Sequence, residues 1–275
     1  MISIIIPVLA SEKETRSLIA SLQTNVKQEL EIIVVVQNDN MHFEGVKNIK
    51  VGENIGCGPA WNLGAKEATG EYFSFLHNDM LLTSDAYTPA LEMFEKDAQL
   101  ELASQFSSIH VPVPVFQEED KEKLGSNSLS FDKHKSGTPS KPGRLGLVCP
   151  SIYSPKGSFD FIWVTQHGNT LPYKSMSRTK TALTLTKAQV ALPFLVSREA
   201  YEAVKGFDER FKPLGWEFID FNTKLRKAGF RRVVRRDLTL WHLGSLDASK
   251  SGLAILELLS QMRLKFREKW GSFLP

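Results

Sequence analysis

The chain has 275 residues, of which 42% are hydrophobic and 24% are charged, and its formal net charge is +3. This composition is typical of a folded domain with a substantial core, the small net charge gives no indication of nucleic-acid binding, and the two cysteines lack the spacing of a zinc site. No stretch reaches the ~18 apolar residues of a membrane span, so we expect a cytoplasmic protein that is soluble or lies at a membrane surface.

The first elements predict a βαβ unit. The β-branched run Ile2–Ile6 indicates a buried parallel strand that Pro7 ends. A capping box at Ser11-Glu12-Lys13-Glu14 predicts the start of a helix. Glu31–Val36 is a second buried strand, and the polar run Gln37-Asn38-Asp39-Asn40 follows it. A right-handed crossover would join these two strands.

The next elements bring a polar triplet to the edge of the predicted sheet. Asn48–Val51 is a short third strand, and a helix is expected between Pro59 and Gly70. Glu71–Leu76 is the following strand, and His77-Asn78-Asp79 lies just past its carboxyl end. Because ligands bind at that edge of open parallel sheets, the triplet is a candidate site.

The rest of the chain alternates shorter elements with one long insertion. Residues 117–145 hold a charge run and then many Gly, Ser, Lys and Pro residues, which predicts a mobile lid or acceptor loop, or else a tolerated surface insertion. Helices are expected from Thr88 to about Asp97, from Ser197 to Gly206 and from Glu217 to Ala228. Strands are expected at Leu145–Ile152, Ala191–Val196, Arg231–Arg236 and Leu238–Trp241.

Two features near the C-terminus each leave two interpretations open. The last helix has an apolar stripe at Ile255, Leu259, Met262, Phe266 and Trp270. We expect this stripe to dock on the protein's own core, and peripheral contact with a membrane surface is the alternative. The arginines at 231, 232, 235 and 236 are expected at a solvated strand edge, with contact to a diphosphate or an anionic acceptor as the alternative.

The glycines at 56 and 58 do not indicate a dinucleotide-binding fold. The third glycine of that fingerprint would fall at position 61, which is Trp61, and the motif follows the wrong strand. We therefore reject a dehydrogenase.

The order of the motifs carries a family resemblance. An Ile-Ile-Ile-Pro strand is followed by Glu31–Val36, by Asn54-Ile55-Gly56, by the run Trp61–Tyr72 and by a strand that leads to Asp79. Family-2 glycosyltransferases share this order, and the resemblance covers residues 2–80 closely. It resumes at about 145–245, where three segments look like the family's acceptor-side half, namely Phe207–Phe211, Trp216–Phe221 and Trp241–Ser245.

The resemblance implies an α/β fold of the GT-A type, in which a mostly parallel Rossmann-type sheet carries helices on both faces. A single catalytic domain would span 1–275, with a nucleotide-sugar-binding half at about 1–100, the inserted flexible loop at 117–145, an acceptor-side half at 146–245 and an amphipathic helix at 246–275. The implied reaction is transfer of a sugar with inversion from a UDP- or dTDP-sugar. The acceptor would be a growing glycan, a lipid-linked saccharide or a protein.

The resemblance also implies a metal site. Relatives carry Asp-x-Asp where this chain has His77-Asn78-Asp79, and the last aspartate reaches the Mn²⁺ or Mg²⁺ that neutralises charge on the diphosphate. His77 and Asn78 are expected to offer polar contacts to the donor. His242 is expected to complete the metal site or to contact the diphosphate. Structural alternatives are a turn residue for Asp79 and a satisfied structural histidine for His242.

The donor base is expected near Pro7, Val8 and the run that follows the second strand. Gln37 stands where the family commonly has an aspartate that reads uracil or ribose, and Asp39 is close by. Trp61 stands where many relatives carry arginine, and we expect it to pack against its helix. Further donor contacts are expected at Asn54, Gly56 and Asn62.

The general base is assigned from the predicted helix that begins near residue 217. Inverting transfer needs a carboxylate to take the proton of the acceptor hydroxyl. The family commonly has Glu-Asp-x-Asp with the middle aspartate as base, and that position is Phe218 here. We therefore assign the base to Glu217, with Asp220 as the alternative. A structural role for both, as favourable charge at a helix N-terminus, stays open.

Two rival functions remain to be weighed. A non-catalytic relative that binds glycans or nucleotide-sugars would be consistent with His77 and Phe218 at positions where the family has aspartates. A sugar-phosphate nucleotidyltransferase is disfavoured, because Pro7-Val8-Leu9-Ala10 lacks the Gly-rich, Arg-containing loop expected after the first strand of that class.

Overall fold

The computed structural model describes residues 1–106, 143–154, 157–159, 163–166, 169–172, 182–184, 194–243 and 255–271. The first half contains β1 (Ile2–Val8), α1 (Glu12–Asn25), β2 (Leu30–Val36), β3 (Lys47–Lys50), α2 (Cys57–Glu67), β4 (Tyr72–Phe75), β5 (Met80–Leu81) and α3 (Tyr87–Phe106). The second half contains β6 (Leu145–Ser154), β7 (Gly157–Phe159), β8 (Trp163–Gln166), β9 (Asn169–Pro172), β10 (Ala182–Thr184), β11 (Leu195–Ser197), α4 (Arg198–Ala203), α5 (Glu217–Lys227), β12 (Arg231–His242) and α7 (Ile255–Trp270).

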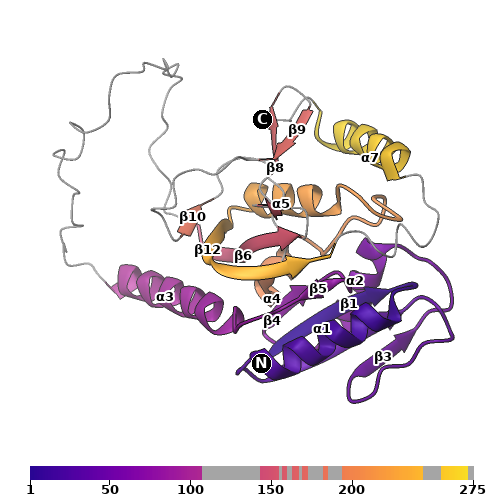
Figure 1. Cartoon of the computed structure of the whole chain (residues 1–275). Helices are drawn as coiled ribbons and strands as arrows, with labels where there is room; N and C mark the ends of the chain where they lie inside the picture. The colour runs from indigo at the N-terminus through magenta and orange to yellow at the C-terminus, as the bar shows by residue number, and fades with distance from the viewer. Residues whose placement is uncertain are drawn as a thin grey trace.

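One large sheet organises the molecule, with the strand order β10-β12-β6-β11-β4-β1-β2-β3 (Figure 1). Strands β1, β2, β3 and β4 are parallel, β11 runs antiparallel to both β4 and β6, and β12 is parallel to β6. The expected α/β class with a mostly parallel sheet is confirmed. Since the chain leaves β1 toward β2 and later returns to its other side as β4, the switch point where such sheets bind ligands lies between β1 and β4.

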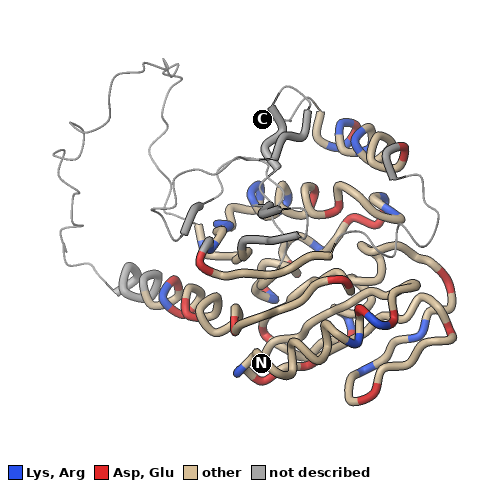
Figure 2. The backbone as a smooth tube through the Cα atoms, viewed as in Figure 1, with Lys and Arg blue, Asp and Glu red and all other residues tan. Residues whose placement is uncertain are grey.

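The core lies along the central strands. All seven residues of β1 are buried, as are the last five of β2. This continuous burial is typical of parallel strands covered on both faces, and each fully buried Val or Ile contributes about 1.5–3 kcal/mol. Helix α2 packs against β1 and β2, and α5 packs against β12. Figure 2 shows Lys and Arg interspersed with Asp and Glu along the described backbone.

One local expectation for the first half is wrong, and another, the helix start at Ser11, holds without the expected capping bond. Pro7 does not end the first strand but lies within β1, opposite Val35. Proline is tolerated there because β4 pairs only with residues 2–5 of β1, so no ladder bond on that side needs the missing N–H. Ser11 precedes α1, yet its side chain makes no capping bond. Its carbonyl instead accepts hydrogen bonds from the N–H and the hydroxyl of Thr15.

The second half differs from expectation mainly in element length. The two strands predicted over 231–241 form one strand, β12, whose pairing with β6 shifts register between Arg235 and Thr239. Helix α3 continues to Phe106, well beyond Asp97. The predicted insertion at 117–145 lies outside the described residues except for 143–145, and so does the start of the strand predicted from residue 191. Among the described helices, none is long and apolar enough to cross a membrane.

The arginines of β12 do not form a solvated edge, because β12 lies inside the sheet between β10 and β6. Arg232 is 1% exposed and donates from Nη1 to the carbonyl of Asn222 in α5, at 3.2 Å. Arg231 pairs with Asp97, and Arg235 pairs with Asp237. The expectation of solvated side chains is therefore wrong for Arg232, and the contacts of Arg231 and Arg235 are within the protein.

The apolar stripe of α7 docks on the protein, as expected. Met262 and Phe266 are buried, and Leu259 is 36% exposed. The Phe266 ring lies 5.2 Å from the ring of Trp216 and 6.4 Å from that of Phe211, between centroids. The central residues of the stripe are thus covered by the loop that precedes α5.

Candidate active site

Asp79 and His242 meet beyond the carboxyl ends of two strands. Asp79 lies between β4 and β5, and His242 ends β12, where it pairs with Met80 of β5. The Nε2 atom of His242 is 3.2 Å from Oδ1 of Asp79, and Asp79 is 2% exposed. The N–H of Leu243 donates to the Asp79 carbonyl at 2.9 Å. The two residues predicted from distant segments as metal ligands are therefore in contact.

The chemistry of this pair fits part of a cation site. Neighbouring ligands in an octahedral shell with metal–oxygen distances of about 2.1 Å lie about 3 Å apart, close to the observed separation of Oδ1 and Nε2. A carboxylate suits Mg²⁺ and Mn²⁺, whereas imidazole is a common ligand of transition metals, so the mixed pair favours Mn²⁺. Among the described residues no group of three His, Cys, Asp or Glu side chains could hold a metal. A cation here would need further ligands beyond this pair, and the oxygens of a bound diphosphate are suited to that role.

An aromatic cluster adjoins the Asp79–His242 pair. His77 stacks on His242 with ring centroids 5.7 Å apart, and meets Trp61 and Phe218 edge-on at 5.2 and 5.4 Å. Trp61 and Phe218 stack on each other at 5.0 Å. Trp61 is fully buried, so the expectation that it packs is confirmed. Three of the positions at which this chain differs from the family it resembles are therefore neighbours, and each aromatic pair adds about 0.5–1.5 kcal/mol beyond area burial.

Glu217 is a buried carboxylate at the first residue of α5. It is 5% exposed, and its Oε2 atom has no hydrogen-bond partner among the described residues. Burial raises the pKa of Glu217 to about 7, although the peptide N–H groups of Glu217 and Gly215 act in the opposite direction. A base that titrates near neutral pH with an open acceptor atom is suited to take a proton from a hydroxyl.

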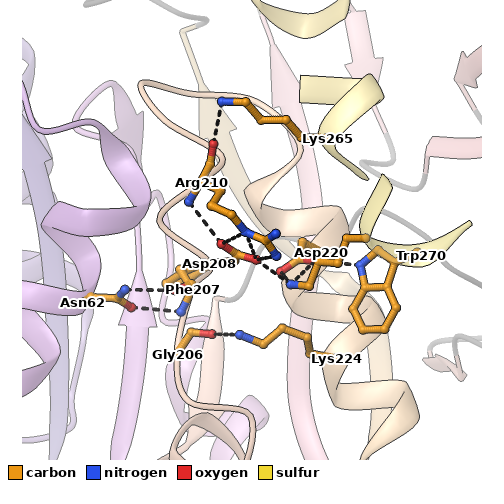
Figure 3. Close-up of polar contacts among 10 residues, drawn as sticks. Asn62, Gly206, Phe207, Asp208, Arg210, Asp220, Lys224, Lys265 and Trp270 are labelled. Carbon is orange, nitrogen blue, oxygen red and sulfur yellow. Dashed lines mark hydrogen bonds and ion pairs between the residues drawn. The ribbon is translucent and has the colours of Figure 1, made fainter. Parts of the chain in front are cut away.

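Asp220 has different surroundings. It is fully buried, and its Oδ1 accepts from Nε1 of Trp270 at 2.7 Å (Figure 3). Nζ of Lys269 lies 2.7 Å from Oδ1 and 2.9 Å from Oδ2. Both carboxylate oxygens are thus engaged by α7, which favours Glu217 over Asp220 as the group that meets an acceptor.

The predicted donor contact Asn62 serves another purpose. Its Oδ1 accepts from the N–H of Phe207 at 2.9 Å and from the hydroxyl of Tyr201 at 2.8 Å. Its Nδ2 donates to the carbonyl of Phe207 at 3.0 Å (Figure 3). The same Nδ2 also donates to Oε1 of Glu209 at 3.0 Å. The Asn62 amide therefore fastens α2 to the segment 201–209, and its role toward a donor stays a prediction.

Gln37, Asn54 and Gly56 shape one loop. The Oε1 atom of Gln37 accepts from the N–H of Ile55 at 2.9 Å and from that of Gly56 at 3.1 Å, and Oδ1 of Asn54 also accepts from Gly56 at 3.1 Å. Gly56 has φ of 88°, and a Cβ at this position would lie 2.8 Å from the carbonyl oxygen of Pro213. The side-chain oxygen of Gln37 thus holds the loop before α2, and the role of Gln37 toward a base stays a prediction.

The other predicted donor residues lie at the expected sheet edge. Pro7 and Val8 are buried at the end of β1, and Asp39 follows β2. Asn78 follows β4, is 5% exposed, and donates from Nδ2 to the hydroxyl of Thr15 at 3.3 Å. Their roles toward a donor stay predictions.

Sequence reasoning missed Lys269 and Trp270, which hold Asp220. The only signal in the sequence is the place of Trp270 at the end of the apolar stripe, with Lys269 beside it. Their partners, Asp208 and Asp220, lie 49 to 61 residues earlier in the chain, and no spacing rule links them.

Comparison with known proteins finds a family to which part of the chain is similar. Residues 3–137 match the model described as glycosyl transferase family 2. A protein of Rickettsia felis named as an uncharacterized glycosyltransferase is 36% identical over 100 residues, which is 32% of this chain and 15% of that protein. A protein of Rickettsia conorii with the same description is 32% identical over 158 residues, covering 54% of this chain and 24% of that protein. The chain thus spans at most 24% of the length of these relatives.

Solved structures with a similar fold include TarS of S. aureus. The match has a TM-score of 0.55 at 13% identity and covers 97% of this chain and 39% of TarS. A shorter TarS chain in complex with UDP-GlcNAc gives a TM-score of 0.56 at 14% identity, covering 88% of this chain and 58% of that one. At such identity the likeness concerns the fold, which is GT-A-like. Residues 3–137 are therefore similar to glycosyl transferase family 2, and the fold is similar to that of TarS.

Proposed function

We propose that this chain transfers a sugar from a UDP- or dTDP-sugar to a hydroxyl of a glycan, a lipid-linked saccharide or a protein, with inversion and with the help of Mn²⁺ or Mg²⁺. The observation that carries the proposal is the contact of Asp79 with His242 at the sheet edge. The buried Glu217 precedes Phe218, whose ring contacts His77 beside this pair. The binding of UDP and UDP-GlcNAc by structures of similar fold supports a nucleotide-sugar donor.

The donor side would be organised by Asp79 and His242. A divalent cation bound there supplies positive charge against the negative charge that develops on the departing diphosphate. Asp79 contributes the anionic ligand, and His242 the neutral one. His77 stands next to the pair and carries no negative charge, so this chain would hold the cation with fewer anionic side chains than Asp-x-Asp provides.

The acceptor side would be served by Glu217. Its open Oε2 atom accepts the proton of the acceptor hydroxyl as the hydroxyl oxygen attacks the anomeric carbon. The attack comes from the face opposite the diphosphate, so the configuration at the anomeric carbon is inverted. Since burial raises the pKa of Glu217 to about 7, the base is ionised only above neutral pH, and the rate should rise with pH through that value.

A non-catalytic relative that binds nucleotide-sugars is the second candidate. The observation that favours it is the aromatic cluster of Trp61, His77 and Phe218, which fills two positions where the family has carboxylates. Such a protein would keep the donor site and lose turnover.

The release of UDP from UDP-GlcNAc with added Mn²⁺ separates the two candidates. Water takes the place of the unknown acceptor in this assay, and a panel of other UDP- and dTDP-sugars extends it. We expect UDP release that depends on Mn²⁺ and stops with EDTA. Stabilisation of the protein by UDP and Mn²⁺ in thermal unfolding, without turnover of any donor, would instead identify the binding protein.

A further inference from the structure

The backbone just before Glu217 is held in an unusual conformation. Gly215 and Trp216 both have positive φ, 98° and 68°. For a residue as bulky as tryptophan this conformation is rare and persists only where surrounding contacts hold it. Since Oε2 of Glu217 has no partner of its own among the described residues, the direction of the carboxylate follows from this turn.

Helix α7 supplies contacts to the turn. A Cβ at position 215 would lie 2.7 Å from Cδ2 of Leu259, so the helix packs directly on the backbone there. The Phe266 ring lies 5.2 Å from the Trp216 ring, at an interplanar angle of 45°. Two successive turns of α7 thus cover the two residues that precede Glu217.

The end of α7 is fastened on both sides of the same segment. Nζ of Lys269 lies 2.7 Å from Oδ2 of Asp208, in the loop before the turn, and 2.7 Å from Oδ1 of Asp220, three residues after Glu217. Trp270 donates to the same Asp220 oxygen (Figure 3). The Lys269 side chain is only 18% exposed, so water weakens this bridge less than it would weaken a surface pair.

The charges around the bridge make Lys269 its centre. Burial raises the pKa of Asp208, but hydrogen bonds from Arg210 and Lys269 outweigh burial and hold that pKa well below its usual range. Lys224 is also near Asp220, yet it donates to the carbonyl of Gly206, and burial lowers its pKa to about 8. Lys269 is therefore the cation that joins Asp208 to Asp220.

We propose that Lys269 is a positioning residue, which fixes the 215–217 turn and thereby aims the Glu217 carboxylate. It does so by bridging Asp208 and Asp220 and by seating α7 on the turn. The effect on turnover rests on the proposed function, in which Glu217 is the base. The effect on the turn does not.

The test compares Lys269→Met with Lys269→Arg and with the matched control Lys265→Met. Lys265 lies one turn earlier on α7 and donates to the Arg210 carbonyl at 2.9 Å. Amide hydrogen exchange of residues 215–221 is measured in the full chain. We expect exchange about tenfold faster in Lys269→Met, unchanged in Lys265→Met, and largely restored in Lys269→Arg, because the arginine keeps the charge that both carboxylates need.

The second measurement is turnover, taken as the rate of Mn²⁺-dependent UDP release. The rate is divided by the concentration of UDP-binding sites, which calorimetry gives. This normalisation removes any loss of folded protein. We expect kcat to fall about tenfold in Lys269→Met while KM for UDP-GlcNAc stays the same, since the bridge does not touch the donor residues. Equal kcat per site, or faster exchange spread evenly over the whole chain, would overturn the proposal and leave Lys269 a stabilising residue only.

The proposal can also be tested if Lys269→Met does not fold or if the wild-type protein shows no turnover. If Lys269→Met does not fold, Asp208→Asn removes the charge at one end of the bridge and leaves the pair of Lys269 with Asp220, and exchange at 215–221 should then rise about threefold. Unchanged exchange in that variant contradicts the bridging role of Lys269. If the wild-type protein binds UDP but releases none from any donor, the proposed function fails, and the exchange measurement still decides whether Lys269 holds the turn.

Discussion

Replacing Glu217 by glutamine should remove a loss of folding stability that occurs as pH rises, and it should also slow the reaction. Glu217 is buried at the start of α5, and burial raises its pKa from an ordinary 4.5 to about 7. Each pKa unit corresponds to about 1.4 kcal/mol, so the ionised form in the folded protein carries a penalty of about 3 kcal/mol. Glutamine keeps the shape of the side chain and removes the charge.

The sign of the pH dependence follows from proton binding. Between pH 4.5 and 7 the folded protein keeps the Glu217 proton, whereas the unfolded chain has lost it, so the stability of the wild-type protein falls as pH rises through this window. Roughly 2–3 kcal/mol are lost between pH 5 and pH 8, which corresponds to roughly 5–10 °C in melting temperature. The glutamine variant lacks this loss. Any cost of its buried amide is the same at both pH values and cancels in the comparison.

The assay is thermal unfolding of both proteins at pH 5 and pH 8, paired with UDP release from UDP-GlcNAc at pH 8. We expect the wild-type melting temperature to fall more between the two pH values than that of the variant. We also expect the variant to release UDP roughly 10²–10⁴ times more slowly, the usual worth of a general base, while UDP affinity with Mn²⁺ stays the same.

Two results would refute this reasoning. An equal pH dependence of melting in both proteins would mean that Glu217 is not held protonated by burial. Normal UDP release by the variant would mean that another group takes the proton. Asp220→Asn then serves as the matched test of the second carboxylate, which Lys269 and Trp270 already engage.

Three further substitutions test the rest of the site. Asp79→Asn removes the anionic ligand, so calorimetry should find Mn²⁺-dependent UDP binding abolished, and normal Mn²⁺ dependence would contradict the metal role. His242→Ala should weaken Mn²⁺ binding with little change in melting temperature, whereas a large loss of stability with normal Mn²⁺ affinity would make it a structural histidine. Asn62→Ala removes four hydrogen bonds between α2 and the acceptor-side half, so urea unfolding should show a loss of about 1–3 kcal/mol with unchanged UDP affinity. Weaker UDP binding at full stability would restore Asn62 as a donor contact.

The sequence allowed the frame of the site to be predicted because its signals are local. The apolar runs of β1 and β2 mark buried parallel strands, and the carboxyl edge of such strands is where ligands bind. Asp79 follows one strand and His242 ends another, so both could be placed at that edge before their contact was known. The pattern of strands in the sequence is therefore enough to predict that residues just after a strand lie at this edge.

The tasks of individual polar residues depended on partners far away in the chain. Asn62 has the residue type of a donor contact, but its amide is used by the segment around Phe207. Asp220 and Glu217 share one face of a helix start, and only the docking of α7 distinguishes them. A carboxylate at a helix start can act as a base or as an ion-pair partner. Which of the two it becomes depends on the side chains of the element that packs over it.

Helix α7 helps to offset the free-energy cost of ionising Glu217 and of the left-handed backbone at Trp216. A folded protein that works above pH 7 must offset the penalty of about 3 kcal/mol from the buried carboxylate, together with the cost of a left-handed Trp216, about 1–3 kcal/mol. Helix α7 contacts Gly215 and Trp216, just before Glu217, and its fully or nearly fully buried Phe266 and Met262 each contribute about 1.5–3 kcal/mol. Burial of this size is comparable to the combined cost. Loosening α7 should therefore relax the turn at 215–217 before it unfolds the sheet, because the strained residues and the ionised carboxylate are the groups that gain most from release.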